Sequence, residues 1–343
     1  MGFAFVASAG DSPLAEQGFI HTFHVSGSHW RAIQTLPTAT PAHLEPHPEL
    51  PILYVTHTID LWQNLPRGAV SAYDIHRTAS TLTLRNTQPL SLSAIRPRHA
   101  AVSPDGKHLL VAAGQGGLYN LLPIASDGTL GAPAAIRKEH GAFDSSQAKI
   151  AHPRHVIFHP SHATALTADT GQESISLFSC APDLVSLQHR VRIHPGAGPS
   201  QLLLSPSGSH VYALHAADGS IAVHPLEGTR ILPVSQSLPH SASGPAYIAM
   251  HPNGRFLVRA SADTITSLAI DSRTGHLSSA HLLSLQEVPR ALAFTPDANY
   301  LLSIDGNSGR IRQIPFHAAS GALGAPQSVA QVEGASSILY RPA

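Results

Sequence analysis

The chain has 343 residues, enough for one large domain or two ordinary ones, and its 21 Lys and Arg residues balance 21 Asp and Glu residues. This balance removes the usual electrostatic signature of nucleic-acid or anionic-membrane binding, so we expect neither partner. Only 12% of residues are charged, whereas Gly (26) and Pro (28) are abundant. Such a composition favours many short strands joined by turns and disfavours long helices.

The chain contains one cysteine, Cys180, which excludes an internal disulfide. An N-terminus without a basic signal-peptide region, combined with this cysteine usage, favours a cytoplasmic location, although a periplasmic one is also compatible. No apolar run reaches the roughly 18 residues that a membrane helix needs. Cys180 falls in the phrase SCAPD, which predicts a turn and has no feature of a nucleophile.

Three strands are predicted first in the chain, at 3–10, 18–25 and 29–36. A phrase then follows that contains a proline, six residues and a second proline, as in PRHAAVSP and PRHVIFHP. It recurs along the chain, and the last copy lacks its first proline. The copies lie at 41–48, 97–104, 153–160, 199–206, 245–252, 289–296 and 335–342. Their closing prolines are 56, 56, 46, 46, 44 and 46 residues apart, and such a period indicates a propeller or a solenoid.

The sequence between the copies favours the propeller. After four of the copies comes a turn signal such as Asp105-Gly106, then an apolar strand such as 108–113, and then a third strand such as 220–226. A weaker fourth strand is predicted near Leu130, Leu187, Leu232, Leu277 and Leu323. Four short strands joined by turns form a propeller blade rather than a helical repeat.

We therefore predict an all-β fold, a seven-bladed β-propeller of four-stranded antiparallel blades in a single domain over residues 1–343. The innermost strands are expected near 43–47, 99–103, 155–159, 201–205, 247–251, 291–295 and 337–341. The last copy has no further strands after it, while the three N-terminal strands lack an inner one. The C-terminal strand is therefore predicted to join the N-terminal blade and close the ring, which removes two exposed sheet edges.

Three stretches resemble a known family: GAVSAYDI at 68–75, RPRHAAVSPDGKHLLVAAGQGG at 96–117 and HPGAGPSQLLLSPSGSHVYAL at 194–214. They are similar to blades of the seven-bladed lactonases, which include bacterial 6-phosphogluconolactonases and fungal carboxymuconate-lactonising enzymes. The resemblance covers essentially the whole chain. It implies the same fold, with an active site in the central cleft where the inner strands and their following loops converge.

The resemblance also implies a catalytic set of a histidine in an H-x-H phrase, two arginines and a glutamate. Carried over by motif, the first histidine is kept as His152, and the second position is Arg154. The other three positions hold Ser200, Ala216 and Ala262. Most of the family's chemistry is therefore replaced in this chain.

By the same comparison, the second residue of each copy faces the central axis. These residues are Ala42, Arg98, Arg154, Ser200, Ala246, Arg290 and Ser336. The planar donor fork of an arginine matches a carboxylate or a phosphate, so Arg98, Arg154 and Arg290 predict a site for a small organic anion. Arg154 could also stabilise an oxyanion during catalysis. The alternative is that each arginine pairs with an acid of a neighbouring blade.

Histidines supply the proton-transfer candidate. His152 precedes an inner strand, where a loop could offer its imidazole to the cleft as a general acid or base. His99 and His155 follow the arginines by one residue, so strand alternation predicts that they face the other way and pack between blades, unless the strand starts irregularly.

The ends of the second strands also lead into the predicted cleft. They carry His57, Asp169, His215 and Asp305. We expect His215, Asp169 and Asp305 to contribute to substrate binding, with the two aspartates replacing the missing glutamate. For Asp169, structural hydrogen bonds in a turn are the alternative.

The 24 histidines are scattered and form no tight ligand motif, so we expect no metal site. The GQGG phrase at 114–117 is not followed by a helix, and no other motif indicates a cofactor.

Two insertions, 58–69 and 137–150, lengthen two repeats. The first could reach over one face of the ring, and the second could form a lid or a plain surface loop.

Two functions remain open. The first is a divergent lactonase-like enzyme that hydrolyses or forms a lactone of a small organic or sugar acid. The second is a non-catalytic propeller that binds a small anion or a protein partner. Three arginines in the predicted central ring favour the enzyme, whereas the replaced catalytic positions favour the binding protein.

Overall fold

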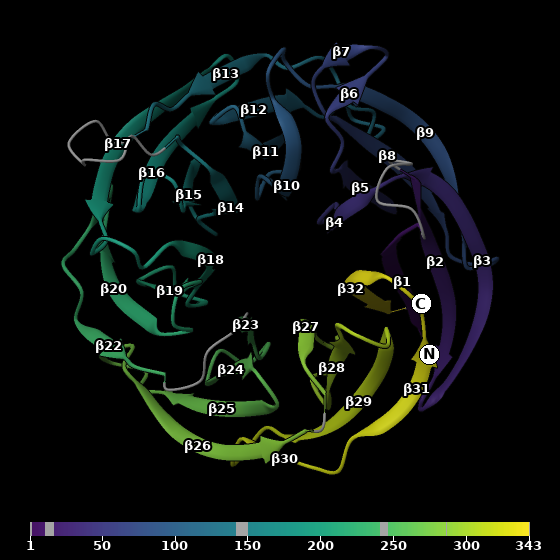
Figure 1. The fold of residues 1–343 in the computed structure, drawn as a ribbon, viewed down its shortest axis with the longest axis vertical. Coiled ribbons are helices and arrows are strands. Elements are labelled where there is room, and N and C mark those ends of the chain that lie inside the picture. Colours follow the sequence, from purple (N-terminus) through teal and green to yellow (C-terminus); the bar gives the residue numbers. More distant parts are fainter. Residues whose placement is uncertain (1, 11–16, 142–149, 241–245, 286, 343) are drawn as a thin grey trace.

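Seven antiparallel β-sheets stand around a common axis and form a closed ring (Figure 1). The computed structural model describes residues 2–10, 17–141, 150–240, 246–285 and 287–342. Within these ranges the secondary structure is strand and turn, with no helix, and therefore no helical segment that could span a membrane. The prediction of an all-β, seven-bladed propeller is confirmed.

Each blade begins with one of the repeated phrases as its innermost strand. Blade 1 contains β4 (Pro41–Pro46), β5 (Ile52–His57), β8 (Ala69–His76) and β9 (Thr81–Pro89). Blade 2 contains β10 (Ile95–Val102), β11 (His108–Gln115), β12 (Leu118–Pro123) and β13 (Ala135–Lys138). Blade 3 contains β14 (Pro153–Phe158), β15 (Thr164–Asp169), β16 (Ser174–Ala181) and β17 (Leu184–Arg192).

The other blades repeat this order, except that the outermost strand of blades 4 and 6 is divided in two. Blade 4 contains β18 (Pro199–Leu204), β19 (His210–His215), β20 (Ile221–Glu227), β21 (Arg230–Ile231) and β22 (Gln236–Leu238). Blade 5 contains β23 (Ala246–Met250), β24 (Phe256–Ser261), β25 (Thr264–Ile270) and β26 (Leu277–Ser284). Blade 6 contains β27 (Pro289–Phe294), β28 (Tyr300–Asp305), β29 (Arg310–His317), β30 (Ala322–Leu323) and β31 (Gln327–Gln331).

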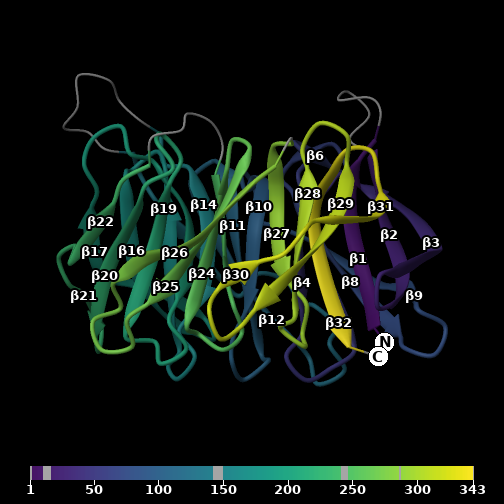
Figure 2. The same cartoon turned by 90° about the horizontal axis from the view of Figure 1, so that it is seen from below.

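Blade 7 joins the two ends of the chain. Its sheet order is β3-β2-β1-β32, where β32 is Ala335–Pro342 and the N-terminal strands are β1 (Gly2–Ala9), β2 (Gln17–Ser26) and β3 (His29–Ala39). The termini therefore lie side by side in both views (Figure 1, Figure 2). The predicted closure of the ring by the C-terminal strand is confirmed.

Some details differ from the sequence predictions. The inner strands all begin earlier than expected. Leu130 makes an isolated bridge with Ile124 rather than entering the fourth strand of blade 2, and Leu232 lies outside β21 and β22. Cys180 lies within β16 and not in a turn.

The 58–69 insertion forms a small hairpin of β6 (Leu61–Trp62) and β7 (Leu65–Pro66). Figure 1 shows this hairpin at the periphery of the ring, away from the axis. It therefore does not cover the centre. Most of the second insertion, residues 142–149, lies outside the described residues.

Apolar side chains hold neighbouring blades together. In the described part of the chain, buried apolar residues form seven clusters, one at each junction between consecutive blades. Successive side chains of a strand point to opposite faces of the sheet, and each blade has a neighbouring blade on both faces. The strands therefore carry apolar residues on both faces. Burial of these side chains supplies the main driving force for assembling the ring.

Histidines in the repeated His-Pro phrases link every second blade to the next. His47 Nε2 lies 3.0 Å from the carbonyl of Gly106, His159 Nε2 lies 3.2 Å from that of Gly208, and His251 Nε2 lies 2.9 Å from that of Ala298. The Nδ1 atom of each ring accepts a backbone N–H from its own turn. In each ring Nδ1 thus accepts a hydrogen bond from its own turn, and Nε2 donates one to the next blade. This structural role accounts for part of the high histidine content.

Replacing His159 with alanine is expected to lower the free energy of unfolding by about 1–3 kcal/mol, because the buried Gly208 carbonyl loses its donor. His162→Ala is the matched control. The His162 ring stacks on His159 but is exposed, so its removal is expected to change stability by no more than about 0.5 kcal/mol. Denaturant unfolding of both variants measures the difference. Equal stabilities would show that the inter-blade bond contributes nothing.

Candidate functional site

A cavity of about 680 Å³ lies on the axis of the ring, and all seven inner strands line it. All seven residues at the second position of the repeat are among the lining residues, as the sequence comparison implied. They are Ala42, Arg98, Arg154, Ser200, Ala246, Arg290 and Ser336. A concave site of this volume is large enough for a small organic ligand.

Irregular pairing at the start of the inner strands determines which side chains face this cavity. The register between first and second strands shifts between Pro97 and His99, and likewise between Pro153 and His155. The arginine between each pair is thus an extra, unpaired residue, as in a β-bulge. Both the arginine and the following histidine consequently line the cavity. The alternation-based expectation that His99 and His155 face away from the arginines is wrong for this reason.

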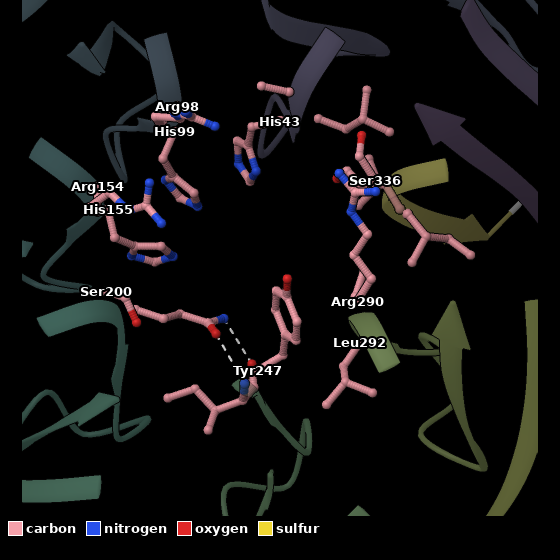
Figure 3. Close-up of a pocket in the computed structure, with 18 of the residues that line it drawn as sticks. His43, Arg98, His99, Arg154, His155, Ser200, Tyr247, Arg290, Leu292 and Ser336 are labelled. Carbon is pink, nitrogen blue, oxygen red and sulfur yellow. Dashed lines mark hydrogen bonds between the residues drawn. The ribbon is translucent and has the colours of Figure 1, made fainter. Parts of the chain in front are cut away.

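Among the residues that the structure describes, the three arginines of the cavity have no protein partner. No hydrogen bond or ion pair involves Arg98, Arg154 or Arg290 within the described ranges. Arg98 and Arg154 extend from adjacent blades, and Arg290 extends from the other side of the cavity (Figure 3). Burial against the cavity wall, together with the positive charges of Arg154 and Arg96, lowers the pKa of Arg98. The alternative of structural pairing is therefore not observed, and the cavity offers three guanidinium forks to a ligand.

Three imidazoles form a continuous stack beside these arginines. The ring centroids of His43 and His99 are 3.7 Å apart, as are those of His99 and His155, so the stack crosses blades 1 to 3 (Figure 3). Burial lowers the pKa of His155 to about 3 and holds that of His99 well below its usual value. The two rings are therefore neutral at physiological pH and provide an aromatic wall rather than charge.

On the side opposite the stack, Tyr247 directs its hydroxyl group into the cavity (Figure 3). Burial raises the pKa of this phenol, so it remains a hydrogen-bond donor at neutral pH. The neighbouring Gln201 is not available to a ligand in the same way, since its amide nitrogen donates to the Ile248 carbonyl and its amide oxygen accepts the Ile248 N–H.

His152 lies beside the arginines, although it is not part of the lining. A Cβ placed on Gly114 would lie 3.0 Å from Arg98 Cγ and 3.3 Å from His152 Nε2, so both side chains pack closely against this glycine. The ring is half-buried, and burial followed by the charges of Arg154 and Arg98 lowers its pKa. A neutral imidazole next to two cations is suited to accept a proton.

The candidate residues at the ends of the second strands lie behind the cavity wall. Asp169 is buried, and its Oδ1 accepts the N–H groups of His152, Gly171 and Gln172. Asp305 is also buried and accepts the N–H groups of Val288 and Ser308. Neither aspartate lines the cavity.

His215 has the same kind of environment. It is buried, its Nδ1 lies 3.0 Å from the hydroxyl oxygen of Ser220, and burial lowers its pKa to about 4. The geometry therefore replaces the expected binding role of Asp169, Asp305 and His215 with a structural one: each aspartate fixes the backbone that leads into its inner strand, and His215 supports its own turn. For His152, Asp169 supplies the anchor that positions the loop.

Within the described ranges, no group of three or more His, Cys, Asp or Glu side chains is arranged to hold a metal ion. Cys180 is half-buried on β16, and burial raises the pKa of its thiol to about 12. It therefore has no thiolate character at neutral pH.

Comparison with known proteins connects this cavity to a family. A family model described as "Lactonase, 7-bladed beta-propeller" matches residues 5–340. The chain belongs to this lactonase family. A 6-phosphogluconolactonase of Serratia proteamaculans is 25% identical over 332 residues, covering 91% of this chain and 92% of the relative. A 6-phosphogluconolactonase of Bacillus subtilis is 22% identical over 256 residues, covering 71% of this chain and 72% of the relative.

Solved structures show the same fold. A periplasmic gluconolactonase of Pseudomonas aeruginosa superposes with a TM-score of 0.86 at 22% identity, covering 99% of this chain and 98% of that one. The three positions at which the resemblance implied a catalytic arginine or glutamate do not all lie in the cavity. Ser200 and Ala216 line the cavity, whereas Ala262 sits in the turn between β24 and β25. The lactonase-family cavity of this chain thus has small residues where the resemblance implied an arginine and a glutamate.

Proposed function

We propose that this protein is a lactonase that acts in the central cavity on a lactone carrying a carboxylate or phosphate group. The observation that carries the proposal is a set of three arginines, Arg98, Arg154 and Arg290, which surround one cavity and have no protein partner in the described part of the chain. An uncompensated cluster of cations destabilises a protein by mutual repulsion, so its presence at a concave site indicates an anionic ligand. The names of the two relatives, both 6-phosphogluconolactonases, support a phosphorylated sugar lactone as the first substrate to test.

In the hydrolytic direction, a water molecule attacks the lactone carbonyl carbon while His152 accepts its proton. Arg98 and Arg154 stabilise the negative charge that develops on the carbonyl oxygen. The ring C–O bond then breaks, and the departing alkoxide takes the proton from the His152 imidazolium. Arg290, from the other side, binds the anionic substituent. The reverse sequence forms the lactone from the hydroxy acid.

His152→Gln is expected to lower kcat/KM by about 10²–10⁴-fold, the range typical of a lost general base. The wild-type rate is expected to fall in acid below the ordinary histidine range, because the lowered pKa keeps the imidazole neutral down to a lower pH. Initial rates on phosphorylated sugar lactones, aldonolactones and muconolactones, corrected for spontaneous hydrolysis, measure both effects. His162→Gln, an exposed histidine in the same blade, is the control and is expected to retain full activity.

The second candidate is a non-catalytic propeller that binds a small anion. The small residues Ser200 and Ala216 in the lining favour it, since they remove two charged groups implied by the family. Saturable binding of an anion without turnover of any lactone would support this second function. Turnover that is insensitive to His152→Gln would remove the proton-transfer role of that residue.

A further inference from the structure

Arg259 occupies a position that is small or aliphatic in other blades. It lies in the middle of β24, paired in register with Ile248 on β23 and with Thr266 on β25. The residues at the matching register position in the other six blades are Val6, Val55, Val111, Thr167, Ala213 and Ser303. Arg259 therefore places a guanidinium in a part of the molecule that elsewhere needs only a small side chain.

This guanidinium is buried and almost without partners. Arg259 is 7% exposed, and its one hydrogen bond to the described residues runs from Nη1 to the Gly219 carbonyl at 3.3 Å. Its Nε is buried and donates to nothing, and no carboxylate lies within ion-pair distance in the described part of the chain. Asp218 acts on it only at longer range, because that carboxylate is exposed and accepts the Ser220 N–H. A buried cation without a counter-ion is strongly unfavourable, so a compensating group is expected.

A second unsatisfied donor lies next to it. His240 has a buried Nε2 without a partner, and its ring packs against Gly219, the residue whose carbonyl accepts from Arg259. Gly219 has φ +68°, and a Cβ there would lie 2.9 Å from the His240 ring and 3.4 Å from Ala246 Cβ. The close approach of these groups thus depends on glycine. Neither Arg259 nor His240 lines the central cavity, whereas Ala246 does, so the pair sits behind the cavity wall.

We propose that Arg259 and His240 form a second anion site, between blades 4 and 5, that binds a small free oxyanion such as inorganic phosphate. One oxyanion accepts from the Arg259 guanidinium and from His240 Nε2–H, which satisfies both donors and neutralises the buried charge. The site is independent of the proposed lactonase activity, since it shares no residue with the cavity that carries that proposal.

Thermal unfolding in sodium phosphate, at an ionic strength held constant with sodium chloride, tests the site. To exclude phosphate bound by the cavity, the parent protein is the triple variant Arg98→Met/Arg154→Met/Arg290→Met. Its unfolding midpoint is expected to rise saturably with phosphate, because a ligand that binds only the native state stabilises it by mass action. Adding Arg259→Met is expected to abolish this rise.

Arg255→Met is the matched control, since Arg255 is an exposed arginine four residues earlier in the same blade, and the phosphate response is expected to persist. His240→Phe, which keeps an aromatic ring and removes the second donor, is expected to weaken the response at least about tenfold in apparent affinity. A triple variant without any phosphate response, or a response that survives Arg259→Met, would overturn the proposal. Loss of lactone turnover in the triple variant would concern only the proposed role of the cavity arginines, because Arg259 and His240 do not line the cavity.

Discussion

Acidification from pH 7 to pH 4.5 is expected to unfold this protein cooperatively. Burial lowers the pKa of His57 to about 4, of His155 to about 3 and of His215 to about 4, and holds that of His99 well below its usual value. In the unfolded chain the same groups take up protons near pH 6.5. The unfolded state therefore binds more protons below that pH, and the stability that is complete above about pH 6.5 is lost as the pH falls toward the folded-state pKa values.

Each of these histidines contributes a slope of about 1.4 kcal/mol per pH unit within that window. Together they are expected to remove several kcal/mol, a large part of the net stability of an ordinary domain. Denaturant unfolding at a series of pH values measures the slope. His155→Phe keeps an aromatic ring beside His99 and removes one titrating group. The variant is therefore expected to reduce the slope of unfolding free energy against pH by about 1.4 kcal/mol per pH unit, which corresponds to one proton. A stability that stays constant from pH 7 to pH 5 would contradict the burial of neutral histidines.

Replacing both Arg98 and Arg154 with methionine is expected to weaken binding of an anionic ligand at least about 100-fold while leaving stability unchanged or raised. Each charge-assisted hydrogen bond contributes roughly 1.5–3 kcal/mol, so losing two accounts for the change in affinity. Stability does not fall, because neither guanidinium has a protein partner in the described ranges and the two charges repel each other. Calorimetric titration with a hydroxy acid product and thermal unfolding measure the two quantities.

Arg85→Met is the control for this experiment. Arg85 forms ion pairs with Asp74 at 2.6 Å and Asp127 at 2.9 Å on the outer part of blade 1 and the adjoining turn. Its replacement is expected to lower stability slightly and to leave ligand affinity unchanged. If the Arg98→Met/Arg154→Met variant instead lost stability and kept its affinity, the cavity arginines would be structural.

The fold was predictable from the sequence because each blade repeats one phrase. The spacing of closing prolines from Pro48 to Pro342 gives the number of inner strands, and the three strands before Pro41 without an inner strand predict the closure with β32. Turn signals such as Asp105-Gly106 place the ends of the strands correctly. The weak outer strands were less predictable, because they have few apolar residues and pair on one side only.

The site was predictable only in part. The residues at the second repeat position do line the cavity, including all three arginines. Alternation misplaced His99 and His155, because a register shift beside each arginine turns two consecutive side chains toward the axis. The same irregularity brings His43 into the imidazole stack, and the AHL phrase at 42–44 offered no separate signal for it.

A position at the end of a second strand did not show whether a side chain lines the cavity or lies behind its wall. Asp169 and Asp305 end the second strands as predicted, but their carboxylates accept backbone N–H groups behind the cavity wall. Arg259 was missed, although the sequence carried a signal: the strand RFLVRA places a charged residue inside an otherwise apolar strand. A charge in such a position is almost always paired or functional when it is buried.

The ratio of kcat/KM for an anionic lactone to that for a neutral lactone of the same ring size tests the central claim most directly. Wild-type protein is expected to prefer the anionic lactone by at least about tenfold, because Arg290 contributes binding energy only to the charged substrate. In an Arg290→Met variant this ratio is expected to fall close to one, with turnover of the neutral lactone reduced far less, because Arg290 is the residue proposed to bind the anionic substituent. An unchanged ratio, or no turnover of either lactone by the wild-type protein, would contradict the assignment of the cavity as a lactonase site.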